Sequence, residues 1–410
     1  MGKIWATALL ICAPLCAENA AVLTFGNASR AVSPTGGSSG PNLEWIGESI
    51  AETLRDVLEL RGLVVLDRDD IQQAYRDLNL RERAILTEAS VMKIGEAVDA
   101  EQVIYGTFEV QPARPGSADD SRGSLKISAR AMDRRKMRQS SKFEESGAMA
   151  DLSSLEAHLA WRALTLVAED RAVPESEFRS LRPPVRLDAE ESYIRGLMAR
   201  TSEQRESYFL QAARLDARFA HPCYQLGALH YQRKEYRQAA EWLEKVGADS
   251  ADYHRASFLL GLARFQSGDY PAAQKAFQAV AAAAPLSEVY NNLAAAESRR
   301  NLPQAVDDFR KALEGDASDP VYHFNTGYAL WKKGEFAAAA ERFRAALDRD
   351  PSDQAATLLL GRCLKKQGPR TDGSDARLQN LERIKTTFEE RAYLQLKSLL
   401  DRKAGTPPTP

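Results

Sequence analysis

A spaced pattern of small and aromatic residues occurs twice in the second half of the chain, and it constrains the fold more than any other feature. Residues 322–351 have the sequence YHFNTGYALWKKGEFAAAAERFRAALDRDP, and residues 254–285 have the sequence HRASFLLGLARFQSGDYPAAQKAFQAVAAAAP. Both place a glycine, a second glycine, an alanine, a phenylalanine and a final proline at the same offsets. Such self-similarity predicts stacked copies of one supersecondary unit.

Each shared residue has a structural reason. A glycine at position 261 lets a neighbouring helix approach closely, and Gly268 suits a tight turn between two helices. Pro285 ends the unit, because proline is poorly tolerated inside a helix. The pattern resembles the tetratricopeptide repeat (TPR), a helix–turn–helix unit with a period of about 34 residues.

Weaker copies flank these two, so a TPR array is predicted over residues 188–368. Residues 375–403 are predicted to form a long C-terminal capping helix, because a solenoid needs a polar-faced element over its last unit. Residues 404–410 are predicted to be a disordered tail. The stretch 171–187 is rich in proline and charge and is predicted to be a linker.

Residues 18–170 alternate between strand-like and helix-like patterns. An amphipathic helix is expected at 43–60, and a pair of strands at 125–133 and 140–149. Further strands are expected at 20–25, 62–69 and 101–110. Helices packed on a mixed sheet would bury these patterns, which predicts a sandwich-like α/β domain.

Four stretches in this region also carry a family resemblance: VLTFGN, WIGESIAETLRDVL, LVVLDRDDIQQAYRDLNL and IGEAVDAEQVIYGTFEV. They resemble a superfamily that includes the TolB-type N-terminal domain, the flagellar protein FlgO and the curli-export subunit CsgG. The resemblance implies an α/β domain of the bacterial envelope with no catalytic signature. Pore formation is not implied, because the turn QPARPGSADDSRGS is polar and short and no barrel hairpins follow.

The fold class is therefore predicted as an α+β/α multidomain protein. A CsgG/FlgO/TolB-like α/β domain at 18–170 precedes an all-α TPR superhelix with its capping helix.

The N-terminus has the pattern of a signal peptide. Lys3 precedes an uncharged run from Ile4 to Ala17, which is too short for a comfortable membrane span. Residues 1–17 are predicted to be cleaved, which places the chain in the periplasm or otherwise outside the cytoplasm. The alternative is an uncleaved N-terminus that tethers the chain to the inner membrane.

No motif of an enzyme, cofactor site or metal site is present. The glycine-rich loop TGGSSGPN has neither the GxxxxGK[ST] lysine nor the GxGxxG fingerprint that hold phosphate groups. The five histidines show no metal-ligand spacing, and no GxSxG elbow occurs. With a net charge of -2, no affinity for nucleic acid is predicted. We therefore expect no catalysis, no cofactor and no metal.

The first helix of each TPR is expected to line a concave face with a candidate peptide-binding groove. The candidate residues are Tyr224, Tyr231, Phe258, Phe265, Asn292, Asn325, Tyr328, Trp331, Lys332, Arg362, Lys365 and Lys366. The resemblance to TPR arrays implies that Asn292 and Asn325 hold a peptide backbone. For Tyr328, Trp331 and Lys332, packing between helices is an equally good interpretation. For Arg362, Lys365 and Lys366 the alternative is a solvated helix face.

The predicted function is that of an exported bacterial TPR scaffold or adaptor in envelope assembly. Its partner would be a protein or an extended, partly acidic peptide. Two other functions stay open: a small-molecule or nucleotide sensor at the strand ends of the α/β domain, and an oligomeric assembly factor for a secretion or flagellar machine. Oligomeric state and peripheral contact with the envelope stay open as well.

Overall fold

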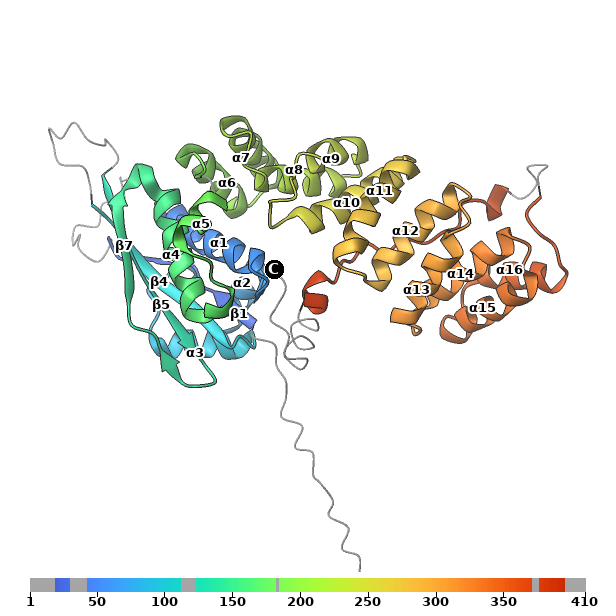
Figure 1. The fold of residues 1–410 in the computed structure, drawn as a ribbon, viewed down its shortest axis with the longest axis horizontal. Coiled ribbons are helices and arrows are strands. Elements are labelled where there is room, and N and C mark those ends of the chain that lie inside the picture. Colours follow the sequence, from blue (N-terminus) through green and yellow to red (C-terminus); the bar gives the residue numbers. More distant parts are fainter. Residues whose placement is uncertain (1–18, 30–42, 112–122, 182–183, 371–375, 395–410) are drawn as a thin grey trace, which may run out of the picture. The chain divides into compact units, whose positions relative to one another are not determined.

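The computed structural model describes residues 19–29, 43–111, 123–181, 184–370 and 376–394 (Figure 1). The chain divides into two compact units between Leu187 and Asp188. The predicted signal peptide, the glycine-rich loop and the tail at 404–410 lie outside the described residues. Within these ranges, no helix has both the length and the apolar character needed to cross a membrane.

The first unit is built on a mixed β-sheet. Strand β1 (Asn19–Val22) lies parallel to both β3 (Val64–Val65) and β4 (Gln102–Gln111). Strand β4 pairs antiparallel with β5 (Ser124–Asp133), which pairs in turn with β7 (Phe143–Ala148). Two short strands extend the sheet, β2 (Gly26–Asn27) beside β4 and β6 (Arg138–Gln139) beside β5. The mixed sheet and the β5–β7 strand pair confirm the sequence predictions.

Helices cover both faces of this sheet, because its central strands are buried on both sides. On one face, Ala21 and Val103 pack with Ile71 of α2 (Arg68–Asp77) and Ile94 of α3 (Glu88–Ala97). Side chains alternate along a strand, so Phe108 of β4 points to the opposite face.

On that opposite face, α1 (Glu44–Leu60) and α4 (Leu152–Val167) pack together. A Cβ atom on Gly47 of α1 would lie 3.1 Å from the Phe108 ring, which shows how closely this helix approaches. Thr53 of α1 donates a hydrogen bond of 3.0 Å to Glu156 of α4. The specific relation to CsgG and TolB stays a prediction.

The stretch predicted as a linker contains a further helix, α5 (Glu175–Leu181). Phe178 of α5 is buried, and the indole N–H of Trp161 in α4 donates to the carbonyl of Val173 at 2.9 Å. The sequence analysis did not predict this helix, which Phe178 holds against α4. The role of the whole stretch as a linker stays a prediction.

The second unit is a run of helices, each packed mainly on its sequence neighbours. Four helix pairs in succession carry the repeat pattern, and they lie between an initial pair and a single last helix. The helices are α6 (Leu187–Met198), α7 (Ser202–Leu215), α8 (His221–Gln232), α9 (Tyr236–Leu243), α10 (Tyr253–Gln266), α11 (Tyr270–Ala283), α12 (Ser287–Arg299), α13 (Ala305–Gly315), α14 (Pro320–Lys332), α15 (Phe336–Arg349) and α16 (Gln354–Leu364).

The turns inside the pairs require a left-handed backbone. Gly268 and Gly334 adopt φ of 83° and 81°, where glycine carries no steric penalty. The equivalent turns use Lys234, Asn301 and Lys366 at φ of 63°, 56° and 54°. The left-handed backbone is thus what these turns share, and glycine is the residue that adopts it with the least steric cost.

A glycine in the first helix marks close approach of the second helix in every pair except α12–α13, where α12 has no glycine. A Cβ atom on Gly261 would lie 2.6 Å from the Phe277 ring, and one on Gly327 would lie 3.1 Å from the Phe343 ring. A Cβ atom on Gly361 would meet nothing within 4 Å, because the chain after α16 does not fold back as a second helix.

We predict that Gly261→Leu lowers the free energy of unfolding by about 1–3 kcal/mol or more, because overpacking forces α10 and α11 apart. Gly361→Leu is the matched control. It should leave stability unchanged or raise it slightly, because leucine favours a helix by about 1 kcal/mol over glycine. Urea denaturation of both variants measures this, and an equal loss at the two positions would contradict the repeat register.

A buried pair of carboxyl groups lies between α12 and α13. Glu297 is 1% exposed and accepts a hydrogen bond of 3.0 Å from the side-chain amide of Gln274. Burial, together with the Asp308 carboxylate, raises the pKa of Glu297 to about 8. The unfolded chain releases this proton near pH 4.5. The free energy of unfolding therefore falls as pH rises from about 4.5 to about 8, and the effect is complete above that range.

We predict that Glu297→Gln removes much of this pH dependence, because the amide carries no proton to lose and still accepts from Gln274. The variant should be more stable than the wild type at pH 9, by an amount on the order of 1–3 kcal/mol, with a smaller difference at pH 5. Urea denaturation at both pH values measures it. Glu314→Gln, which changes an exposed carboxylate on α13, is the control. If the free energy of unfolding changed equally with pH in the wild type and both variants, Glu297 would not be the group responsible.

Candidate peptide-binding groove

The chain's own C-terminal segment, residues 376–394, covers α10, α12 and α14, each the first helix of its pair, and is drawn in red in Figure 1. This segment starts with the short turn Ala376–Leu378, has no helical residue from 379 to 389, and becomes helical at 390–394. The prediction of a capping helix over 375–403 is therefore wrong for residues 379–389. Leu381, Ile384 and Phe388 recur at a helical spacing, but contacts with the array override that local preference.

Two asparagines hold the backbone of the C-terminal segment. Asn325 donates to the carbonyl of Arg383 at 2.7 Å and accepts from the N–H of the same residue at 2.9 Å. Asn292 makes the same pair of bonds with Lys385, both at 2.7 Å. In an extended chain, alternate residues present their backbone groups to the same side. Asn325 and Asn292, at equivalent positions of successive repeats, therefore bind alternate residues of the segment, Arg383 and Lys385.

A third asparagine connects these two. Asn291 donates to the Arg383 carbonyl at 2.9 Å and accepts from Asn325 at 2.7 Å. All three asparagine side chains are completely buried. Burying an amide is costly unless it is hydrogen-bonded, so any segment that covers this surface must offer hydrogen-bond partners to the amides.

A buried carboxylate anchors the middle of the segment. The side chain of Glu382 is 1% exposed and forms ion pairs with Arg299 at 2.5 Å and Lys332 at 3.4 Å. The Ser298 hydroxyl donates to the same carboxylate at 2.7 Å. Arg299 also donates to the carbonyl of Asn380 at 2.6 Å. The site therefore accepts an acidic side chain at this position of an extended segment.

The next basic residues of the segment pair with aspartates that begin helices. Arg383 donates both its terminal nitrogens to Asp353, at 2.7 and 2.9 Å, and lies 3.5 Å above the Phe324 ring. Lys385 pairs with Asp319. Burial opposes ionisation of Asp353, but hydrogen bonds from Arg383 and a backbone N–H keep the pKa of Asp353 below its usual value.

Aromatic residues of the array contact both ends of the segment and the chain just before it. Tyr328 donates to the carbonyl of Leu378 at 2.7 Å, and Trp331, stacked on Tyr328, donates to the carbonyl of Gln367 at 2.8 Å. Burial, with the nearby Glu382 charge, raises the pKa of Tyr328 to about 12, so the phenol is a donor. At the other end the Phe388 ring stacks on Phe258 with 4.8 Å between centroids.

The structure places the predicted candidates in three groups. Asn292, Asn325, Tyr328 and Lys332 form hydrogen bonds or ion pairs with the segment 376–394, Phe258 stacks on it, and Trp331 lies beside Tyr328 under the same cover. A second group packs on aromatic neighbours: Tyr231 lies against Tyr236, and Phe265 against Tyr270. Tyr224 lies beside the core cluster of α8 and α9. Binding of a separate peptide stays a prediction for all of them.

The third group lies at the end of α16. Arg362 is half-buried on the last turn of the helix, while Lys365 and Lys366 follow its final residue and are exposed. Lys366 occupies the left-handed turn position, so it is not on the inner face of a helix. The basic residues that contact the Glu382 carboxylate of the segment are Arg299 and Lys332. Arg299, Ser298, Asp319 and Asp353 were missed, because their roles depend on where the segment crosses the helix ends.

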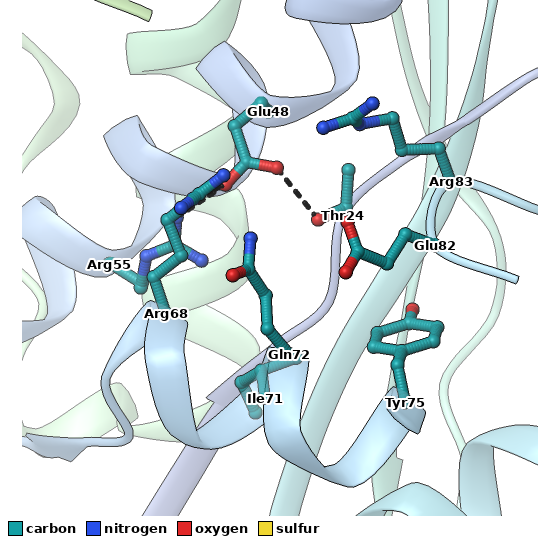
Figure 2. A pocket seen from close by; sticks show the side chains of 9 residues that line it. All are labelled: Thr24, Glu48, Arg55, Arg68, Ile71, Gln72, Tyr75, Glu82 and Arg83. Carbon is teal, nitrogen blue, oxygen red and sulfur yellow. Dashed lines mark hydrogen bonds and ion pairs between the residues drawn. The ribbon is translucent and has the colours of Figure 1, made fainter. Parts of the chain in front are cut away.

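The first unit contains a small cavity beside the end of β1 (Figure 2). Its volume is about 10 Å³, enough for about one water molecule. Glu48 there accepts from Thr24 at 3.0 Å and pairs with Arg68 at 2.5 Å and Arg55 at 3.5 Å. Burial alone would raise the pKa of Glu48, but the two arginines keep that pKa below its usual value. The charges compensate one another, and the space is too small for a nucleotide.

Neither metal ligation nor disulfide chemistry is evident in the part of the chain that the structure describes. No group of three or more His, Cys, Asp or Glu side chains there is placed to hold a metal ion. Cys223 and Cys363 are buried and unpaired.

Comparison with known proteins identifies the repeats. The tetratricopeptide repeat family matches residues 258–320 and 324–368, so the chain carries TPRs there. Among solved structures, MamA from residue 41 onward, from Desulfovibrio magneticus RS-1, is 24% identical with a TM-score of 0.36, over 40% of this chain and 95% of that one. YrrB, described as a TPR protein with an unusual peptide-binding site, is 17% identical with a TM-score of 0.37, over 50% and 98%. No curated protein sequence matches the chain.

Proposed function

We propose that this chain is an exported bacterial scaffold whose TPR array holds an extended segment of a protein partner on its inner face. The inner face is defined here by Asn291, Asn292, Asn325, Tyr328 and Lys332. One observation carries the proposal: these residues hold an extended polypeptide, the chain's own segment, by bonds from asparagine amides to its backbone.

The chemistry of the inner face supports peptide binding over simple helix packing. Bonds to backbone groups suit any extended segment, because every residue except proline offers the same N–H and C=O. The Glu382 pocket and the Phe258 ring add side-chain selectivity to these backbone contacts. This combination of backbone bonds and side-chain pockets is a general mode of peptide recognition.

The cellular setting of this scaffold is proposed from the sequence. The signal-like residues 1–17 support export, and the resemblance of residues 18–170 to CsgG, FlgO and TolB supports a role in envelope assembly. The α/β domain would then contribute the envelope contact, and the array would recruit the partner.

Export is tested by the N-terminus of the native protein. Mass spectrometry of the chain purified from its own cells should give a mature first residue near Glu18, because cleavage after Ala17 removes the apolar run. An intact Met1 in a cytosolic fraction would exclude export.

Partner binding is tested by capture from envelope extract with the full chain as bait. The wild type and Gln278→Ala, which removes an exposed amide on α11, should capture the same protein. Asn292→Ala combined with Asn325→Ala should reduce capture about tenfold or more, because four backbone hydrogen bonds are lost. Thermal melts verify that each variant is folded. Equal capture by the folded double variant would place the partner elsewhere on the chain.

A further inference from the structure

We infer that residues 378–390 are a built-in ligand. They cover the inner face until a partner segment of the same chemistry displaces them. That chemistry is an extended stretch with a glutamate, basic residues one and three positions later, and an aromatic residue six positions after the glutamate. The inference rests on the proposed function, to which it adds the class of partner segment and the way its access is controlled.

The contacts of the segment include those of a bound peptide, because side chains of the inner face bond to its backbone, beside the apolar packing of Leu381, Ile384 and Phe388 on the array. Backbone bonds to the inner face occur at Arg383 and Lys385, and they come from side chains of α12 and α14. Neither a helix nor a sheet ladder fixes the segment between residues 381 and 389. Another extended segment could therefore make the same bonds in the same places.

The buried ion pairs point to selectivity. Replacing a buried ion pair by apolar residues is often neutral or stabilising, so a permanent cover would not need Glu382 facing two cations. A buried carboxylate does discriminate between segments, because a neutral or basic residue would leave Arg299 and Lys332 uncompensated. Asp353 and Asp319 extend the same charge pattern to Arg383 and Lys385.

Both sides of the contact are suited to separation. Charged or hydroxyl residues separate the apolar side chains Leu381, Ile384 and Phe388 in the sequence, so the released segment presents no continuous apolar patch. On the array, release would uncover the asparagine amides and the Tyr328 hydroxyl, which water can satisfy, together with the Phe258 and Phe324 rings that an aromatic or basic side chain of the partner would cover again.

The covalent connection determines how strongly the segment competes. Helix α16 ends at Leu364, and the first anchored residue of the segment is Leu378, so the connection is short. A ligand tethered by a short linker acts at an effective concentration of about a millimolar. A partner segment with similar contacts must therefore compete with the built-in ligand, which lowers the partner's apparent affinity for the wild-type chain.

The test uses the full chain and a fluorescent synthetic peptide of residues 376–393 as the probe. Glu382→Lys should expel the built-in ligand, because it places a third cation beside Arg299 and Lys332, while the inner face stays intact. Glu341→Lys makes the same charge change at an exposed side chain of α15, outside the segment, and is the matched control. We expect the probe to bind Glu382→Lys at least tenfold tighter than it binds the wild type or the control.

Hydrogen exchange of residues 381–388 verifies release in the same samples. The amides of Arg383 and Lys385 donate to asparagine side chains, so they should be protected in the wild type and exchange at least tenfold faster in Glu382→Lys. If one substitution leaves them protected, Glu382→Lys is combined with Phe388→Ala. Protection that persists in this double variant refutes Glu382 as the anchor and overturns the inference.

Three binding results would also overturn it. Equal probe affinity for the wild type and Glu382→Lys would show that the segment does not compete. No probe binding to a chain whose segment is released would show that the segment is not a ligand. A wild-type dimer that dissociates in Glu382→Lys would assign the segment to a second copy.

The proposed function fails or stands separately. A partner captured through Asn292 and Asn325 while residues 381–388 stay protected would refute displacement and leave the scaffold function in place. If the probe binds only when the segment is released but no partner is captured, the segment is a ligand of the inner face and the scaffold function loses its support.

Discussion

The hydrogen-bonding requirement of three buried asparagine amides determines how the inner face of the TPR array can be covered. Asn291, Asn292 and Asn325 bond to one another and to a polypeptide backbone, and none of them reaches solvent. An apolar helix laid on this surface would leave the amides without partners. An extended strand satisfies them because its N–H and C=O groups are free. The C-terminal segment is therefore extended here despite its helical spacing of apolar residues.

The repeats were the predictable part of the structure because they follow from local and steric rules. Gly261 and Gly327 indicated close helix contacts, and Gly268 and Gly334 indicated left-handed turns, as the structure has them. The mixed sheet of the first unit followed equally from alternating patterns. These features depend on residues near one another in sequence or on one repeated unit.

The candidate site was only partly predictable, because it depends on a long-range contact. Asn325 and Arg383 are distant in sequence, and no periodic pattern indicates that the backbone of Arg383 bonds to Asn325. Asp319 and Asp353 also cap helices, since each accepts from a backbone N–H of its own helix, and no sequence pattern distinguishes their second role as partners of Lys385 and Arg383. The positions of Lys365 and Lys366 after the C-terminal end of α16 were not predicted, for a simpler reason. The helix stops before Lys365, so a count of helical faces no longer applied there.

The arrangement of Glu382 also matters for how such a chain could change over generations. The inner face and the segment that covers it are encoded in one chain but contain different residues. Under the proposed displacement, substitutions between Leu378 and Phe388 alter the affinity that a partner needs, without altering any atom that the partner touches. The affinity that a partner needs and the choice of partner could thus evolve independently. The first would change by substitutions in the segment, and the second by substitutions in α12 and α14.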